Sequence, residues 1–147
     1  MTAVLTDIPR DRLDEVLFGA LRAIYRFQLV KVSEFNLDYE EIYLLQFLRR
    51  HSPARMGDIA AEMGIPISTA TRVVDRLQRK KRLGRRRDPA DRRNVLVTLR
   101  PAGERAVRMI EEHTFALLMR NVEQFTEADI FAFFKTAVNM EKILSVE

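Results

Sequence analysis

The chain has 147 residues, of which 47% are hydrophobic and 31% charged, which is ordinary for a globular domain with a real core. It has no cysteine, which excludes disulfides, thiolate metal sites and cysteine nucleophiles. No segment is apolar over the roughly 18 residues that a membrane span needs, and the first residues lack the basic and apolar regions of a signal peptide. We therefore expect one folded domain in the cytoplasm.

Positive charge is concentrated in one segment of the chain. Residues 72–93 contain eleven Lys or Arg and three acids, a local charge of +8 in a chain whose net charge is +4, which leaves −4 for the rest. A basic segment on an acidic body is typical of a protein that binds the phosphate backbone of a nucleic acid. Most charge runs, however, are simply solvated, so composition alone does not decide between the two interpretations.

The first half of the chain predicts several helices. Apolar positions recur every three to four residues over residues 10–32, in a stripe wider than one face. A second helix fits residues 38–50, with Asp38 as its N-cap. A short helix over about 55–63 ends at Gly64.

The next helix begins near Pro66 and runs to about Lys81. After it, the stretch LGRRRDPADRRNVLVTL predicts a β-hairpin. Three consecutive arginines place at least one arginine on each side of the outgoing strand, and DPAD has the composition of a turn. The return strand has alternating apolar residues at Val95, Val97 and Leu99, which we expect to anchor the hairpin on the domain.

Two further helices complete the chain. One begins at Pro101 and continues toward Val122. The final helix begins at Thr126, where Asp129 completes a near capping box, and extends to Leu144. The apolar residues of this helix, like those of the first one, cover a wider arc than a single core contact requires. We therefore expect both helices to bury surface in a stable dimer.

The two helices on either side of Gly64 have the pattern of a helix-turn-helix. Apolar residues stand where the two helices would pack together, Ala60 is small where they cross, and glycine suits the turn. An ordinary helical hairpin remains the alternative. The arginine-bearing hairpin that follows makes the order that of a winged helix, with the hairpin as the wing.

The second of these helices has an outward face suited to reading DNA. That face contains Ser68, Thr69, Arg72 and Arg76, with Thr71 partly joining it. Hydroxyl groups near a helix N-terminus can reach phosphates or base edges, and arginine can bind guanine with two hydrogen bonds in the major groove. An arginine at the wing tip can enter the minor groove, and a neighbouring aspartate can hold it by a salt bridge.

The stretches STATRVVDRL and DPADRRNVLVTL resemble the MarR family of bacterial transcription regulators, and the similarity spans nearly the whole chain. The resemblance implies a single MarR-type domain over residues 1–147 that is mainly α with a small β-hairpin wing. A winged helix-turn-helix lobe of about residues 38–100 would be joined to dimerisation helices of about 8–35 and 101–147. It also implies an obligate homodimer that binds a pseudo-palindromic operator in double-stranded DNA as a repressor.

Position by position, the resemblance also implies a set of DNA contacts. They are Ser68, Thr69, Thr71, Arg72 and Arg76 on the helix, with Arg92 and Arg93 at the wing. The sequence departs from the family at four positions. Arg55, Pro66 and Arg100 stand where a Ser or Thr helix cap is usual, and Lys81 replaces a glycine at the end of the recognition helix.

The resemblance further implies release of DNA when a small aromatic or phenolic anion binds between the dimer helices and the winged lobe. Candidate contacts on the first two helices are Arg22, Tyr25, Arg26, Tyr39, Tyr43 and Phe47. Aromatic residues at helical spacing are more often core residues. His51 and His113, the two histidines, supply too few ligands for a zinc site, so we expect no metal.

Two other classes of function remain open at this stage. An enzyme is not expected, because no pair of nucleophile and base, phosphate-binding glycine loop or metal cluster is visible, and no cofactor is implied. A winged helix that binds protein or RNA instead of operator DNA is the stronger alternative, since clustered arginines do not distinguish these partners.

Overall fold

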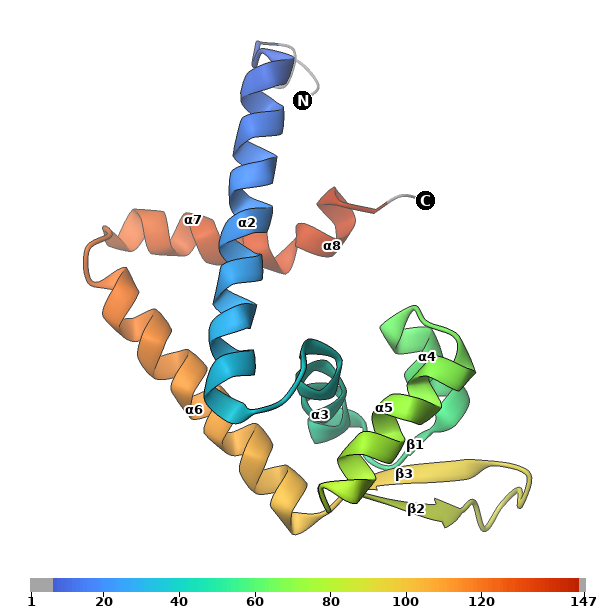
Figure 1. The fold of residues 1–147 in the computed structure, drawn as a ribbon. Coiled ribbons are helices and arrows are strands. Elements are labelled where there is room, and N and C mark those ends of the chain that lie inside the picture. The colour runs from blue at the N-terminus through green and yellow to red at the C-terminus, as the bar shows by residue number, and fades with distance from the viewer. Residues whose placement is uncertain (1–6, 146–147) are drawn as a thin grey trace. The chain divides into compact units, whose positions relative to one another are not determined.

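The computed structural model describes residues 7–145 and divides into two compact units, Met1–Ile110 and Glu111–Glu147 (Figure 1). The fold is mainly α-helical with one small antiparallel sheet, as the sequence predicts. No helix in the described part of the chain is long and apolar enough to cross a membrane.

Helix α2 spans Arg10–Phe35, three residues further than the sequence predicts, and ends at Asn36 in the left-handed conformation. Among its described residues, Lys31 is the buried one, and the Lys31 ammonium lies 4.8 Å from the centroid of the Phe27 ring. Burial lowers the pKa of Lys31. Large apolar side chains of α2 are exposed instead, with Phe18 and Leu21 both 64% exposed.

Helix α3, Tyr39–His51, begins as predicted at Asp38, where Asp38 and Glu41 form a capping box. Helix α4, Met56–Met63, ends at Gly64, whose φ of 62° is the left-handed conformation that glycine adopts without a steric penalty. Helix α5 follows at Ile67–Arg79. The fully buried side chains of these helices form one core. They include Ile42, Leu44, Leu45, Leu48, Ile59, Val73, Val74 and Leu77.

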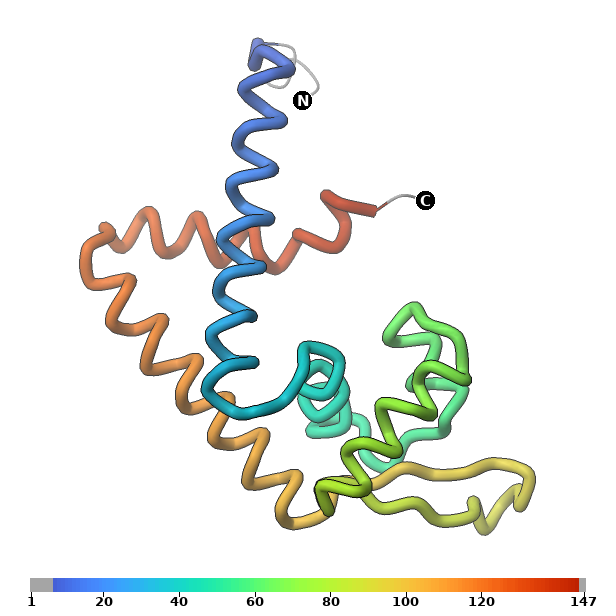
Figure 2. Tube along the Cα trace, in the orientation of Figure 1, coloured from blue at the N-terminus to red at the C-terminus, as the bar shows by residue number. Residues whose placement is uncertain are grey.

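The sheet has three antiparallel strands in the order β1-β3-β2. Strand β2, Leu83–Arg87, and strand β3, Val95–Leu99, form the predicted hairpin. Figure 2 shows the Cα trace of their connecting loop extending beyond the helix-turn-helix. Strand β1, Ala54–Arg55, was not predicted, because two residues are too short to show a periodic pattern.

The predicted alternation of buried residues in β3 is only partly right. Val97 is fully buried, but Leu96 is also buried, whereas Val95 and Leu99 are half-buried. The reason is that β3 is the central strand, so Leu96 lies in register between Arg55 of β1 and Arg86 of β2. The long aliphatic parts of arginine side chains can cover an apolar neighbour in this way.

The turn between α5 and β2 fits closely against the start of helix α6, Pro101–Val122. Lys81 has a φ of 58°, which explains why the resemblance expects glycine there. A Cβ atom on Gly103 would clash with the carbonyl oxygen of Arg82, so only glycine fits at this point. The N–H of Arg100 donates to the same carbonyl at 2.9 Å.

The second unit contains the end of α6, helix α7, Glu127–Val138, and helix α8, Met140–Ile143. Thr126 and Asp129 form the predicted capping box. The prediction of a single final helix is wrong. Asn139 ends α7, and α8 is a separate helix that begins after it. The Asn139 side-chain amide donates to the carbonyl of Lys135 at 2.8 Å, a bond that competes with continued helix.

Candidate nucleic-acid interface

The first half of α5 presents polar side chains to solvent. Ser68 and Arg72 are exposed, and Thr69 and Thr71 are half-buried, as expected for the outward edge of the helix. The Thr71 hydroxyl donates to the carbonyl of Ile67 at 2.8 Å, which leaves its lone pairs available. The first turn contains no acidic residue. This end of the helix therefore favours an anion such as phosphate.

Strand β2 is tied to α5 by a single arginine. Arg85 donates hydrogen bonds to the carboxylate of Asp75, to Oε1 of Gln78 at 3.0 Å and to the carbonyl of Thr71 at 3.3 Å. Asp75 is the sole acid of α5, and its charge is compensated here. The wing and the recognition helix are thus joined directly, so their relative position is fixed within this unit.

The wing turn is organised by two aspartates. Asp88 accepts a hydrogen bond from the N–H of Ala90 at 2.9 Å and pairs with Arg55 of β1 at 3.2 Å. The bond from Ala90 lowers the pKa of Asp88, burial opposes this, and Arg55 lowers it further. Asp91 accepts from the N–H of Arg93 at 3.0 Å, as an Asx turn does.

These contacts correct the prediction that a tip aspartate holds Arg92 by a salt bridge. Asp88 pairs with Arg55 instead, because β1 lies next to β3 and brings Arg55 to the base of the turn. The carbonyl of Arg92 accepts from Arg87 at 3.0 Å. Within residues 7–145, the side chains of Arg92 and Arg93 make no hydrogen bond or ion pair, and both residues are exposed. Both guanidinium groups are accordingly available to a ligand.

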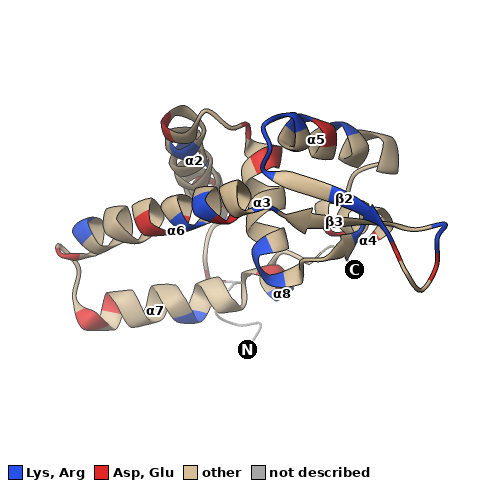
Figure 3. Ribbon diagram, turned by 90° about the horizontal axis from the view of Figure 1, so that it is seen from below, with Lys and Arg blue, Asp and Glu red and all other residues tan. Residues whose placement is uncertain are grey.

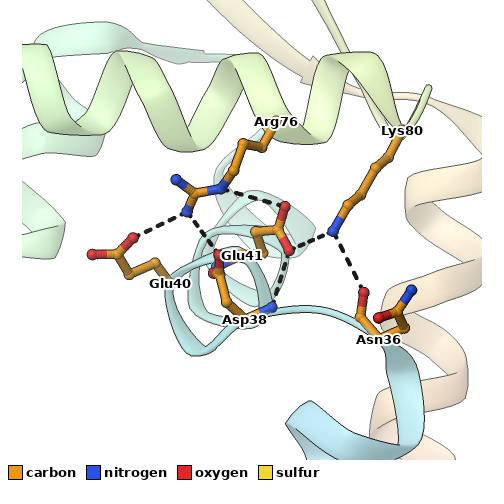
Figure 4. Close-up of polar contacts among 6 residues, drawn as sticks. All are labelled: Asn36, Asp38, Glu40, Glu41, Arg76 and Lys80. Carbon is orange, nitrogen blue, oxygen red and sulfur yellow. Dashed lines mark hydrogen bonds and ion pairs between the residues drawn. The ribbon is translucent and has the colours of Figure 1, made fainter.

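Arg76 does not lie where the sequence places it. Its guanidinium turns from the outward face of α5 toward the start of α3, as Figure 4 shows, and is 33% exposed. Nη2 lies 2.8 Å from Oδ2 of Asp38 and 3.1 Å from Oε2 of Glu40, and Nε lies 3.7 Å from Oε1 of Glu41. Partial burial lowers the pKa of Arg76, but the hydrogen bond to Glu40 and the neighbouring carboxylates outweigh it and raise the pKa.

Lys80 joins the same group of charges. Its Nζ lies 2.7 Å from Oε2 of Glu41 and donates to the carbonyl of Asn36 at 3.4 Å. Glu41 is only 1% exposed and also accepts from the N–H of Asp38 at 3.0 Å. Sequence reasoning missed this network. The available signal was the spacing of Arg76 and Lys80, four residues apart on one helix face, and the acidic run that begins at Asp38.

Positive charge therefore follows α5 and the wing, as the sequence predicts. Figure 3 shows Lys and Arg positions along α5, along β2 and in the loop that connects β2 to β3. The part of this surface that remains uncompensated includes Arg72 on the helix and the two arginines of the wing tip. An exposed helix face beside a basic hairpin loop is the arrangement by which a winged helix contacts the grooves of duplex DNA.

The candidate effector residues on α3 lie beside two cavities. Tyr39 and Tyr43 line a cavity of about 300 Å³ with residues of α4, and Tyr43 and Phe47 line a second cavity of about 300 Å³ that also includes Glu62. The Tyr43 hydroxyl donates to Oε1 of Glu62 at 2.9 Å. Both cavities lie between α3 and α4 and are lined by residues of the winged lobe.

The α2 candidates lie elsewhere. Arg22, Tyr25 and Arg26 do not line either cavity, and the Arg22 guanidinium carbon lies 6.0 Å from the centroid of the Phe18 ring. Tyr25 is 61% exposed. The structure thus separates the six predicted effector residues into an α3 group beside cavities and an exposed α2 group.

The histidines and acids do not gather around a metal position. Within residues 7–145 there is no group of three or more His, Cys, Asp or Glu side chains that could hold a metal ion. The His51 ring stacks on Phe47 with centroids 4.6 Å apart, and its Nδ1 lies 3.1 Å from the Phe47 carbonyl oxygen.

The exposed recognition helix, the joined wing and the basic surface define a winged helix-turn-helix protein. The model of the MarR family matches residues 37–95. The chain is 32% identical over 110 residues to the uncharacterized HTH-type transcriptional regulator YsmB of Bacillus subtilis, which covers 75% of each protein. This chain therefore belongs to the MarR family, which is a family of transcription regulators and not a class of enzymes.

Solved structures show the same fold over nearly the whole chain. RV1404 from Mycobacterium tuberculosis superposes with a TM-score of 0.81 at 24% identity, covering 96% of this chain and 97% of that one. FabT of Streptococcus pneumoniae, solved in complex with DNA, has a TM-score of 0.78 at 18% identity and covers 92% and 97%.

Proposed function

We propose that this regulator is a sequence-specific repressor that binds a pseudo-palindromic operator as a homodimer. The observation that carries the proposal is the outward half of α5, with Arg72 and Ser68 exposed beside a wing whose two tip arginines have no partner among the described residues. The fold similarity to FabT, solved in complex with DNA, supports the same partner. Binding to DNA implies action in the cytoplasm.

Different parts of the surface have different tasks in this proposal. Ser68, Thr69, Thr71 and Arg72 contact base edges and phosphates in the major groove. The wing arginines, Arg92 and Arg93, reach the adjacent minor groove, where the potential is most negative if the groove is narrow. Asp75 and Arg85 join the wing to α5. The major-groove contacts of α5 and the minor-groove contacts of the wing therefore stay at a constant distance from each other along the duplex.

The homodimer is supported by exposed apolar surface on the two helical ends of the chain. These described side chains are exposed and are too numerous for the surface of a monomer. They include Phe18, Leu21, Ile24, Phe131, Phe133, Phe134 and Val138. A symmetric dimer buries the same patch on both copies and presents two recognition helices to two half-sites.

Release by a small aromatic or phenolic anion remains part of the proposal. The cavities beside Tyr39, Tyr43 and Phe47 are of a size for a single aromatic ring and lie between α3 and α4. Binding there would act on the packing of α3 against α4, the first helix of the helix-turn-helix.

A gel-shift experiment tests the core of this proposal. The probe is the DNA upstream of the protein's own gene, with and without a large excess of nonspecific duplex. We expect a complex that survives the competitor, because specific binding exceeds nonspecific binding by roughly a thousandfold or more. A complex that the competitor removes completely, or binding only to RNA, would overturn the proposal.

A further inference from the structure

A set of five charged residues joins the start of α3 to the end of α5 around a buried carboxylate, and it has no place in the DNA contacts described above. It consists of Asp38, Glu40 and Glu41 at the start of α3 and of Arg76 and Lys80 at the end of α5, and we name it the α3–α5 clamp. We propose that the α3–α5 clamp positions α5 and thereby sets the discrimination between operator and random DNA, without itself contacting DNA. This inference rests on the proposed function.

Glu41 is the centre of the clamp. Its carboxylate is 1% exposed and has three partners: the N–H of Asp38 at 3.0 Å, Nζ of Lys80 at 2.7 Å and Nε of Arg76 at 3.7 Å (Figure 4). One group therefore caps α3 and receives two cations from α5. A buried carboxylate requires this compensation, because an unpaired charge in the interior is strongly destabilising.

The clamp supplies a directional contact that the apolar core lacks. α5 packs inward through Ala70, Val73, Val74 and Leu77, but this apolar burial is non-directional. The planar guanidinium fork of Arg76 fixes geometry instead, since Nη2 lies near both Asp38 and Glu40 while Nε faces Glu41. A rotation of α5 about its axis would break these contacts and also move Arg72, which lies one turn earlier on the same side of the helix.

The opposite flank of α5 has its own charged contact. Asp75, the neighbour of Arg76 in the sequence, binds Arg85 of the wing. The two adjacent residues thus hold α5 to α3 on one side and to β2 on the other. Lys80 adds a contact with the carbonyl of Asn36, the residue that ends α2.

The charge balance argues against a phosphate contact by the clamp. Three carboxylates and two cations give it a net charge of −1, which disfavours an approaching phosphate. Arg72, by contrast, has no acid partner within residues 7–145. Arg76 therefore acts as a positioning residue, whereas the sequence analysis predicts that it contacts DNA.

The decisive variant is Glu41→Gln, because two explanations predict opposite signs. Loss of a negative charge near a DNA-binding surface should tighten binding to all DNA if only electrostatics matters. A positioning role predicts weaker binding to specific DNA only. The probes are a duplex selected by the wild-type protein from a random library and a scrambled duplex of the same composition. We expect about a tenfold loss of affinity for the selected duplex, and none for the scrambled one.

Two variants of single arginines complete the experiment. Arg76→Lys keeps the net charge but loses the fork, so we expect reduced discrimination with an unchanged slope of log K against log salt. Arg79→Gln is the matched control, since Arg79 is exposed on the same helix and has no acid partner among the described residues. We expect it to weaken both duplexes by the same factor and to make the salt slope shallower.

The outcomes separate the inference from the proposed function. Wild-type protein that does not distinguish the two duplexes would overturn both. Wild-type discrimination that Glu41→Gln and Arg76→Lys leave intact would overturn the inference alone. Circular dichroism checks the fold of each variant, and if Glu41→Gln does not fold, Arg76→Lys decides the question, because its side chain is partly exposed and keeps its charge.

Discussion

Helices α5 and α7 are almost equal in length, with 13 and 12 residues, but they use their apolar residues in opposite ways. α5 buries four apolar side chains completely within its own lobe. α7 is richer in apolar residues and buries none, with Phe131 72% and Val138 82% exposed. A helix with one apolar stripe can be completed by its own chain, whereas a helix that is apolar around most of its surface needs a partner. The following predictions test this contrast.

The largest effect is expected from charges on α7. Phe131→Asp together with Phe134→Asp should convert the proposed homodimer to a monomer, raising the dimer dissociation constant by roughly a hundredfold or more, because each copy loses two central aromatic contacts. Light scattering at micromolar concentration measures the mass. Lys135→Gln on the same helix is the control and should stay dimeric. If the wild-type protein had the mass of a monomer, the contrast between α5 and α7 would have no basis.

The next effect concerns the buried side of α5. Leu77→Ala should lower the free energy of unfolding by about 2 to 5 kcal/mol, because it leaves a cavity in the core at a fully buried side chain. Denaturant unfolding measures this. Arg79→Ala, on the exposed side of the same helix, should change stability by less than about 0.5 kcal/mol. Equal losses in the two variants would mean that α5 is not anchored by this face.

The outward side of α5 should affect recognition and not stability. Arg72→Ala should cost about 1 to 3 kcal/mol of binding per half-site, with a larger loss on specific than on random DNA. Fluorescence anisotropy with both duplexes measures the ratio. Arg79→Ala controls for charge on the same helix. A uniform loss on both DNAs would reassign Arg72 to the phosphate backbone.

The wing should contribute mainly through charge. Arg92→Ala removes one phosphate-region contact per subunit, so a dimer loses two, and the slope of log K against log salt should become shallower by about 1.8. Specific and random duplexes should weaken by similar factors. An unchanged affinity and slope at low salt would show that the wing tip does not meet DNA.

The smallest effect is expected at the base of the wing and depends on pH. The lowered pKa of Asp88 means that its contribution to stability is present above its ordinary value of 3.8 and is lost as the pH falls through the lowered value. Asp88→Asn should therefore flatten the change of stability between about pH 5 and pH 3. Thermal melts across that range measure it, and identical pH profiles for both proteins would contradict the role of Asp88.

Local signals in the sequence determined most of the elements. The caps at Asp38 and Thr126 are made within three residues, so they can be seen in the sequence, and helical periodicity located the two helices around Gly64. The concentration of positive charge in residues 72–93 likewise indicated a nucleic-acid partner before any contact was known.

The tertiary structure alone decided which charges are free to meet DNA. Arg76 is engaged by acids at the start of α3, and Asp88 binds Arg55, a residue 33 positions away. Such ion pairs depend on how helices and strands pack. The pattern of residues in a single sequence cannot show with which of several arginines an acid will pair. The same holds for β1, which exists only because β3 offers it a free edge. Sequence periodicity records which face of an element is apolar, whereas ion pairs between distant elements are set by the packing of those faces.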